Sequence, residues 1–291
     1  MGHNHSHGHN STKNIKVAFF LNITFTVFEI IGGFWTNSVA ILSDAIHDLG
    51  DSLSLGLSWY LDKKSKQSSN NRFSFGYQRF SLLGALINGM VLITGSLFLL
   101  TEIIPRLVEP QEANAKGMLV FALFGIVVNG AAVLRVRKGK TLNERVVSLH
   151  LLEDVLGWVA VLIVSIVLMF WNIPILDPIL SLVILSYVFY NVVKNLKETL
   201  LVFLQGVPTD INLQELEQKI GGIDNILSVH QVKVWSLDGA EHVLTIHIVI
   251  KEETTISAII ELKKQVKSLL KEFHVEHATI EVEFENEDCY H

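Results

Sequence analysis

The residues best suited to chemistry in this chain are histidines and aspartates that lie inside otherwise apolar segments. One segment contains His47 and Asp51, and another contains His150 and Asp154. In both, the histidine precedes the aspartate by four positions, so in a helix the two side chains share one face. A charged side chain at the centre of a bilayer costs about 2.5–3.5 kcal/mol to insert, so such pairs need a functional or structural reason.

Two helices that each present a His-x-x-x-Asp pair can enclose a cation between them. Two imidazoles and two carboxylates would then surround one tetrahedral point, which is a ligand set that zinc accepts. Magnesium and calcium prefer more oxygen ligands. The spacing therefore predicts a zinc site formed by His47, Asp51, His150 and Asp154. One alternative stays open, in which each pair is a buried ion pair that only holds helices together.

Other polar residues of the apolar segments are expected to play accessory parts. Adjacent residues of a helix point about 100° apart, so Asp48 is not expected to share the ion of His47. The residues expected to lie beside the ion, to face water or to line the cavity are Asp44, Asp48, Glu153, Glu29 and Asn22. Asn88 and Asn129 are expected to form hydrogen bonds between helices.

A metal site at the centre of a membrane bundle suits transport by alternating access. Histidine titrates near neutral pH, and zinc must displace protons from its ligands, so one site can exchange Zn²⁺ for H⁺. We therefore expect a zinc/proton antiporter and not an enzyme. Two alternative functions are an intramembrane metal-dependent hydrolase and a zinc-sensing receptor. The hydrolase lacks the helical His-Glu-x-x-His signature, and the ionisable residues of the membrane segments argue against a receptor whose pore does not conduct.

Six apolar stretches must position these residues, and each is close to the length of about 20 residues that crosses a bilayer. They cover residues 15–35, 39–61, 80–100, 118–134, 146–170 and 175–193. Lysine and arginine gather on one side of the membrane in this arrangement, and only Arg106 and Lys116 lie on the other. The positive-inside rule then places both termini in the cytoplasm. The sequence thus predicts a multi-pass protein with a six-helix, all-α membrane domain over residues 14–205.

Residues 206–291 have a different composition, with 7 basic and 16 acidic residues. This acidic balance argues against nucleic acid as a partner. The pattern predicts helix 211–220, strands 228–237 and 243–250, helix 257–273 and strand 279–284. Such an αββαβ domain is small, so we expect it to dimerise. Residues 1–13, with alternating His3, His5, His7 and His9, are expected to form a disordered tail that binds metal weakly.

The paired motif resembles that of the cation diffusion facilitator family, whose bacterial members export zinc in exchange for protons. Further matching pieces are the run 38–42 before His47, the run 73–76, Asp177 with Pro178, and the C-terminal α+β domain. The resemblance implies that His47, Asp51, His150 and Asp154 bind the transported ion. It also implies zinc, because the zinc members of the family carry histidine at the first of these positions.

The resemblance further implies a homodimer in the bacterial inner membrane with a cytoplasmic, metallochaperone-like (ferredoxin-like) domain that binds more zinc. Its ligands would be His230, His247 and Glu283, with His277 close by. His242 and His274 are expected at the surface of that domain. Phe73 and Tyr77 stand where some members of the family have ligands of another metal site, so that site is not expected here.

Overall fold

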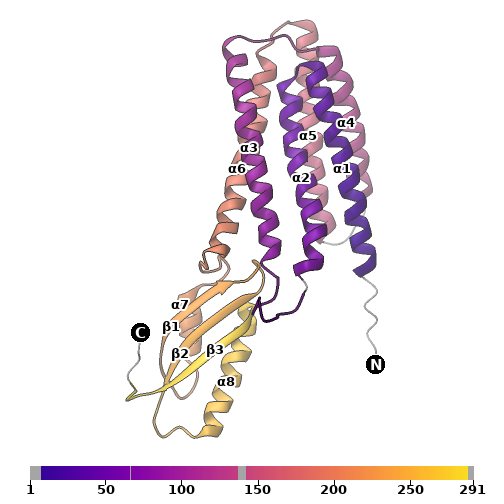
Figure 1. Ribbon diagram of the computed structural model, residues 1–291. Coiled ribbons are helices and arrows are strands. Elements are labelled where there is room, and N and C mark those ends of the chain that lie inside the picture. Colours follow the sequence, from indigo (N-terminus) through magenta and orange to yellow (C-terminus); the bar gives the residue numbers. More distant parts are fainter. Residues whose placement is uncertain (1–7, 66, 137–141, 288–291) are drawn as a thin grey trace. The chain divides into compact units, whose positions relative to one another are not determined.

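The computed structural model describes residues 8–65, 67–136 and 142–287, and for residues 8–18, 58–59, 62–63, 65, 135–136 and 142–151 it describes the backbone alone. The chain, drawn in Figure 1, divides into two compact units. One unit comprises the residues up to Tyr60 together with Gly84–Asn195. The other comprises Leu61–Leu83 together with the residues from Leu196 onward.

Six long helices are formed before the C-terminal domain, in agreement with the predicted helical membrane domain (Figure 1). They are α1 Gly8–Thr36, α2 Val39–Ser65, α3 Phe80–Val108, α4 Ala115–Val136, α5 Leu142–Phe170 and α6 Leu176–Phe203. Five of these helices are long and apolar enough to cross a membrane. The sixth, α2, carries Asp44, Asp48 and Asp51, so its polar side chains must find partners on its neighbours.

Several hydrogen bonds hold the beginning of α2 against the beginning of α6. The carboxylate of Asp177 accepts hydrogen bonds from the Ser38 hydroxyl (2.5 Å) and from the Val39 backbone N–H (2.8 Å). It therefore satisfies free N–H groups at the start of α2, in the way that a capping residue does. One turn later the hydroxyls of Ser43 and Ser181 lie 2.5 Å apart. These contacts set the position of α2, and with it the position of His47.

Close packing against α4 fixes the position of α5. Trp158, which is 1% exposed, lies directly against Gly125 of α4. A Cβ atom at Gly125 would lie 2.2 Å from Cδ2 of Trp158, so this contact requires glycine. Ile41 and Val161 extend the same apolar cluster. Because Trp158 follows Asp154 by one helical turn, this packing also determines where Asp154 lies.

The C-terminal domain has the predicted αββαβ order (Figure 1). Its elements are α7 Leu213–Gly221, β1 Ile226–Ser236, β2 His242–Ile250, α8 Ile256–Leu270 and β3 Val275–Phe284. A short 3₁₀ helix, η1 Lys271–Phe273, takes up the end of the second predicted helix. The sheet order is β1-β2-β3, in which β1 and β2 are antiparallel and β2 and β3 are parallel.

The two faces of this sheet differ in composition because successive side chains of a strand point to opposite sides. On β2, Leu244, Ile246, Ile248 and Ile250 are fully buried and pack with apolar residues of α7 and α8. His247 lies between two of these core positions and therefore belongs to the other face. Alternation along β1 and β3 brings further polar residues to that face, which holds the second candidate site.

Candidate metal centres

The first candidate centre lies between α2 and α5. The ring Nε2 of His47 is 3.7 Å from Oδ2 of Asp51, one turn further along α2. The same nitrogen is 3.8 Å from Oδ1 of Asp154 on α5. All three side chains are largely or partly buried. A cation bound between these atoms would thus replace the direct contacts between the imidazole and the two carboxylates.

His150 is the fourth predicted ligand of this centre. Its backbone lies in α5, four residues before Asp154, so the two residues occupy one face of that helix. The side chain of His150 lies outside the described part of the structure. His47, Asp51 and Asp154 are therefore the predicted ligands whose convergence can be followed.

Asp48 lies closer to this centre than helical geometry suggested. One carboxylate oxygen of Asp48 and ligand atoms of His47 and Asp51 all lie within 4.8 Å of one another. Asp48 is only 5% exposed. The rotation between neighbouring residues separates their Cα–Cβ directions, but two adjacent side chains can still lean toward one point. Asp48 thus belongs to this site, although helical spacing alone predicted that it would not share the ion of His47.

Two further acids stand beside the same centre. Asp44 is 5% exposed, and its Oδ1 would lie 3.4 Å from a Cβ built on Gly157 of α5, so it faces that helix. Glu29 of α1 is completely buried, and its carboxyl interacts with the charges of Asp48 and Asp44. Both acids therefore lie in the environment that was expected of them, beside the ligands.

Of the two amides predicted to bond between helices, Asn88 does so, and Asn22, which was expected to line the cavity, also bonds to a neighbouring helix. The side chain of Asn22 on α1 donates hydrogen bonds to the Asp48 carbonyl (3.2 Å) and to Ser52 Oγ (3.1 Å) on α2. Asn88 of α3 donates to Ser54 of α2 (2.7 Å). The Nδ2 group of Asn129, however, has no acceptor within the described residues.

The second candidate centre lies on the face of the sheet opposite α7 and α8. His230 on β1 and His247 on β2 are direct cross-strand partners. Glu283 on β3 contacts both, with Oε2 3.1 Å from His230 Nε2 and Oε1 2.5 Å from His247 Nδ1. Ligand atoms of these three residues lie within 4.8 Å of one another. Three different strands thus bring one donor set together.

A β-bulge lies beside the first of these histidines. The pairing register shifts between His230 and Lys233, and Gln231 has a positive φ of 49°. An extra residue of this kind bends a strand and re-aims its side chains. It explains why Val229 and Val232, three positions apart, both pack against the core.

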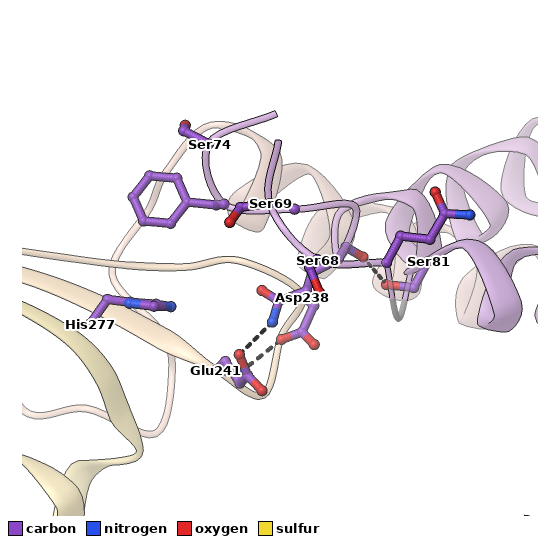
Figure 2. Close-up of a pocket in the computed structure, with 11 residues that line it drawn as sticks. Ser68, Ser69, Ser74, Ser81, Asp238, Glu241 and His277 are labelled. Atoms are coloured by element: carbon purple, nitrogen blue, oxygen red, sulfur yellow. Dashed lines mark hydrogen bonds between the residues drawn. The ribbon is translucent and has the colours of Figure 1, made fainter. Parts of the chain in front are cut away.

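His277, the remaining predicted ligand, is not part of this group. It is exposed and lies against the ring of Phe75, with centroids 5.7 Å apart. It lines a polar pocket of about 600 Å³ that also includes Asp238 and Glu241 (Figure 2). Glu241 Oε2 accepts a hydrogen bond of 2.6 Å from Gln78 there. The structure therefore separates His277 from His230, His247 and Glu283.

His242 is not a surface residue, and this part of the prediction is wrong. Its side chain is 1% exposed at the start of β2. Its Nε2 lies 3.2 Å from Oδ2 of Asp210. Burial alone would raise the pKa of Asp210, but the hydrogen bond and the charge interaction with His242 hold it below its ordinary value. His274 is exposed, as predicted.

The chain matches known proteins over nearly its whole length. Residues 15–204 match the family model of the cation efflux transmembrane domain, and residues 208–285 match that of the cation efflux protein cytoplasmic domain. The cadmium, cobalt and zinc/H(+)-K(+) antiporter of Bacillus subtilis is 32% identical, over 98% of this chain and 93% of its own.

Two further relatives agree with these matches. The zinc transporter ZitB of Pectobacterium atrosepticum is 32% identical over 100% of this chain and 92% of its own. The metal cation efflux system protein CzcD of Cupriavidus metallidurans is 30% identical over 97% of this chain and 90% of its own. With both domains matched in order, the chain belongs to the cation efflux, or cation diffusion facilitator, family, and it is a membrane transporter of metal cations rather than an enzyme.

Proposed function

We propose that this protein exports Zn²⁺ from the cytoplasm across the bacterial inner membrane, in exchange for protons, as a homodimer with cytoplasmic termini. The transported ion would be held by His47, Asp51, His150 and Asp154. The observation that carries this proposal is the convergence of His47 with acids from two helices, Asp51 on α2 and Asp154 on α5. Mixed imidazole and carboxylate ligands suit zinc.

The ligand chemistry supports exchange of zinc for a counter-ion. Zinc binds the neutral form of histidine and the ionised form of aspartate, so protons compete with the metal for the same groups. Relatives carry both H⁺ and K⁺ in their names, together with zinc. We infer that protonation of the empty site on the outer side completes the cycle, and that K⁺ is a second counter-ion.

Zinc flux into proteoliposomes tests this proposal. With an imposed pH gradient, we expect Asp154→Asn to lower zinc flux to background, because one ligand charge is lost while the shape of the side chain is kept. The matched control is Glu109→Gln, which removes an exposed carboxylate elsewhere and should transport zinc as the natural protein does. Flux in Asp154→Asn equal to that of the control would refute the assignment of the site.

We further propose that His230, His247 and Glu283 bind zinc in the cytoplasmic domain and sense its concentration there. Each strand of the sheet supplies one ligand, so binding would tie the three strands together. Two ring nitrogens and a carboxylate form a ligand set that zinc uses in other proteins, with a further position left for water or another group. This site would be distinct from the transport site, and zinc bound to it would regulate the rate of transport.

A further inference from the structure

Glu29 is a buried acid that zinc coordination does not use. It lies on α1, is completely buried, and neither of its carboxylate oxygens has a hydrogen-bond donor among the described residues. A buried carboxylate without a donor or a counter-charge is strongly unfavourable, so such groups are neutralised by a bound cation or a proton. Glu29 therefore needs an explanation of its own.

The groups that face Glu29 are acidic as well. Its carboxyl interacts with that of Asp48, and the charges of Asp44 and Asp154 also act on it. No lysine or arginine contributes to this environment within the described part of the chain. The titratable groups that act on Glu29 among the described residues are thus acids, and a cation at this position would be attracted by their carboxylates in the ionised form.

Oxygen atoms without charge complete the surroundings of Glu29. Asn22, Thr26 and Glu29 recur at helical spacing on one face of α1, and Thr26 and Asn22 bond Ser52 of α2. Thr26 Oγ1 lies 3.3 Å from Ser52 Oγ. Asp48 and Ser52 likewise share one face of α2. The space between the two helices is therefore bordered by carboxylate, hydroxyl and amide groups.

We propose that Glu29 and Asp48 form a second cation site between α1 and α2, and that it binds the counter-ion K⁺. The inference rests on the proposed function, since it names where the second counter-ion of that exchange would bind. Oxygen ligands suit hard cations, whereas zinc also accepts imidazole ligands such as that of His47. K⁺ in particular is bound in proteins by oxygen atoms that replace its hydration shell.

Asp48 is the group that would couple the two cations. One of its oxygens lies within 4.8 Å of the ligand atoms of His47 and Asp51, and its carboxyl also reaches Glu29. Two cations held on either side of one carboxylate repel each other strongly in a buried environment. Occupation of the K⁺ site would therefore weaken zinc binding, and zinc would expel K⁺. Such mutual exclusion is what an exchanger requires.

Binding of radioactive Rb⁺, a substitute for K⁺, to the purified full-length protein tests this site directly. We expect saturable Rb⁺ binding that K⁺ and zinc both displace. Glu29→Gln keeps the shape of the side chain but removes its charge, and it should weaken Rb⁺ binding by about tenfold or more. Glu29→Asp should retain most of it. Zinc should still bind to Glu29→Gln, as followed by calorimetry, because its ligands are intact.

Two comparisons separate this proposal from the proposed zinc transport. Asp154→Asn should lose zinc flux but keep saturable Rb⁺ binding, weakened less than in Glu29→Gln because Asp154 acts on the site only through its charge, and Glu109→Gln should keep both. If the natural protein binds no Rb⁺, or if Glu29→Gln binds it unchanged, the second site is refuted while zinc transport through Asp154 stands. If Asp154→Asn transports zinc normally, the transport site is refuted. Rb⁺ binding that is lost in Glu29→Gln would still support the second site.

Discussion

At the scale of single residues, Glu283 is the acid that joins the candidate zinc ligands of the cytoplasmic domain. It is 6% exposed and touches both His230 and His247. A buried carboxylate between two imidazoles attracts a divalent cation but also holds the imidazoles in place when no cation is bound. Its removal should therefore affect metal affinity and the geometry of the ligands together.

Glu283→Gln should lower the zinc affinity of the cytoplasmic site by about 10–100-fold, which is the usual loss when a group that orients metal ligands is changed. Calorimetric titration in the Asp154→Asn background isolates this site from the transport site. Glu276→Gln is the control, since Glu276 is an exposed acid on the same strand. Equal zinc affinity of the two variants would contradict the assignment of Glu283 as a ligand.

Periodicity predicted some of these residues but not others. His47 and Asp51 share a helix face by spacing, and so do His150 and Asp154, so the transport centre could be proposed from two short motifs. His277 could not be excluded in the same way. It shares the strand and the sheet face of Glu283, and only the position of Phe75, about two hundred residues earlier in the chain, shows where it lies.

At the scale of helices, the α4–α5 contact leaves its side chains little room to move. Gly125→Ala should destabilise the protein by about 1–3 kcal/mol, because the new methyl group would overlap the Trp158 ring and force the helices apart. The midpoint of thermal unfolding in detergent, followed together with zinc flux, measures the effect. Flux should fall as well, since Trp158 and Asp154 are one turn apart.

Gly130→Ala is the matched control for this change. Gly130 lies on the same helix, and a Cβ built on it meets no atom within 4 Å. Alanine also has a higher helix propensity than glycine, so this variant should be as stable as the natural protein or slightly more stable. The same loss of stability in both variants would show that α4 tolerates no side chain at these positions, contrary to the role given to Trp158.

Hydropathy was sufficient to locate the helices but not to pair them. The apolar stretches predicted the six long helices because length and composition are local properties. The contacts of Asp177 with Ser38 and of Ser181 with Ser43 link residues almost 140 positions apart. Serine and aspartate near a helix end suit capping within their own helix equally well, so only the fold shows that they join α6 to α2.

At the scale of the whole molecule, the cytoplasmic domain is the part expected to hold two copies together. Its single three-stranded sheet is covered by helices on one face, and the other face carries His230, His247 and Glu283. The match to a cytoplasmic cation efflux domain is consistent with dimerisation. A domain of this size has a small core, and association would add to its stability.

Light scattering of the purified protein in detergent should therefore give the mass of a homodimer. We expect the dimer to persist in Glu283→Gln and after zinc is removed by a chelator, because apolar burial does not depend on one metal ligand. A monomer in the natural protein would contradict this arrangement. Dissociation on chelation alone would instead mean that zinc itself forms the interface.

The polar contacts of α2 also bear on the order in which the protein is synthesised and assembled. His47 of α2 contacts Asp154 of α5, and the Val39 backbone N–H at the start of α2 donates to Asp177 at the start of α6, so both partners are synthesised later than α2. Ser38 precedes Asp177 by 139 positions, which ribosomes take on the order of ten seconds to cover. During that interval α2 must remain loosely inserted or be held by the insertion machinery. The proposed transport site is thus complete only after α5 and α6 have been synthesised, and we expect a chain that stops before α6 to leave α2 open to quality-control proteases.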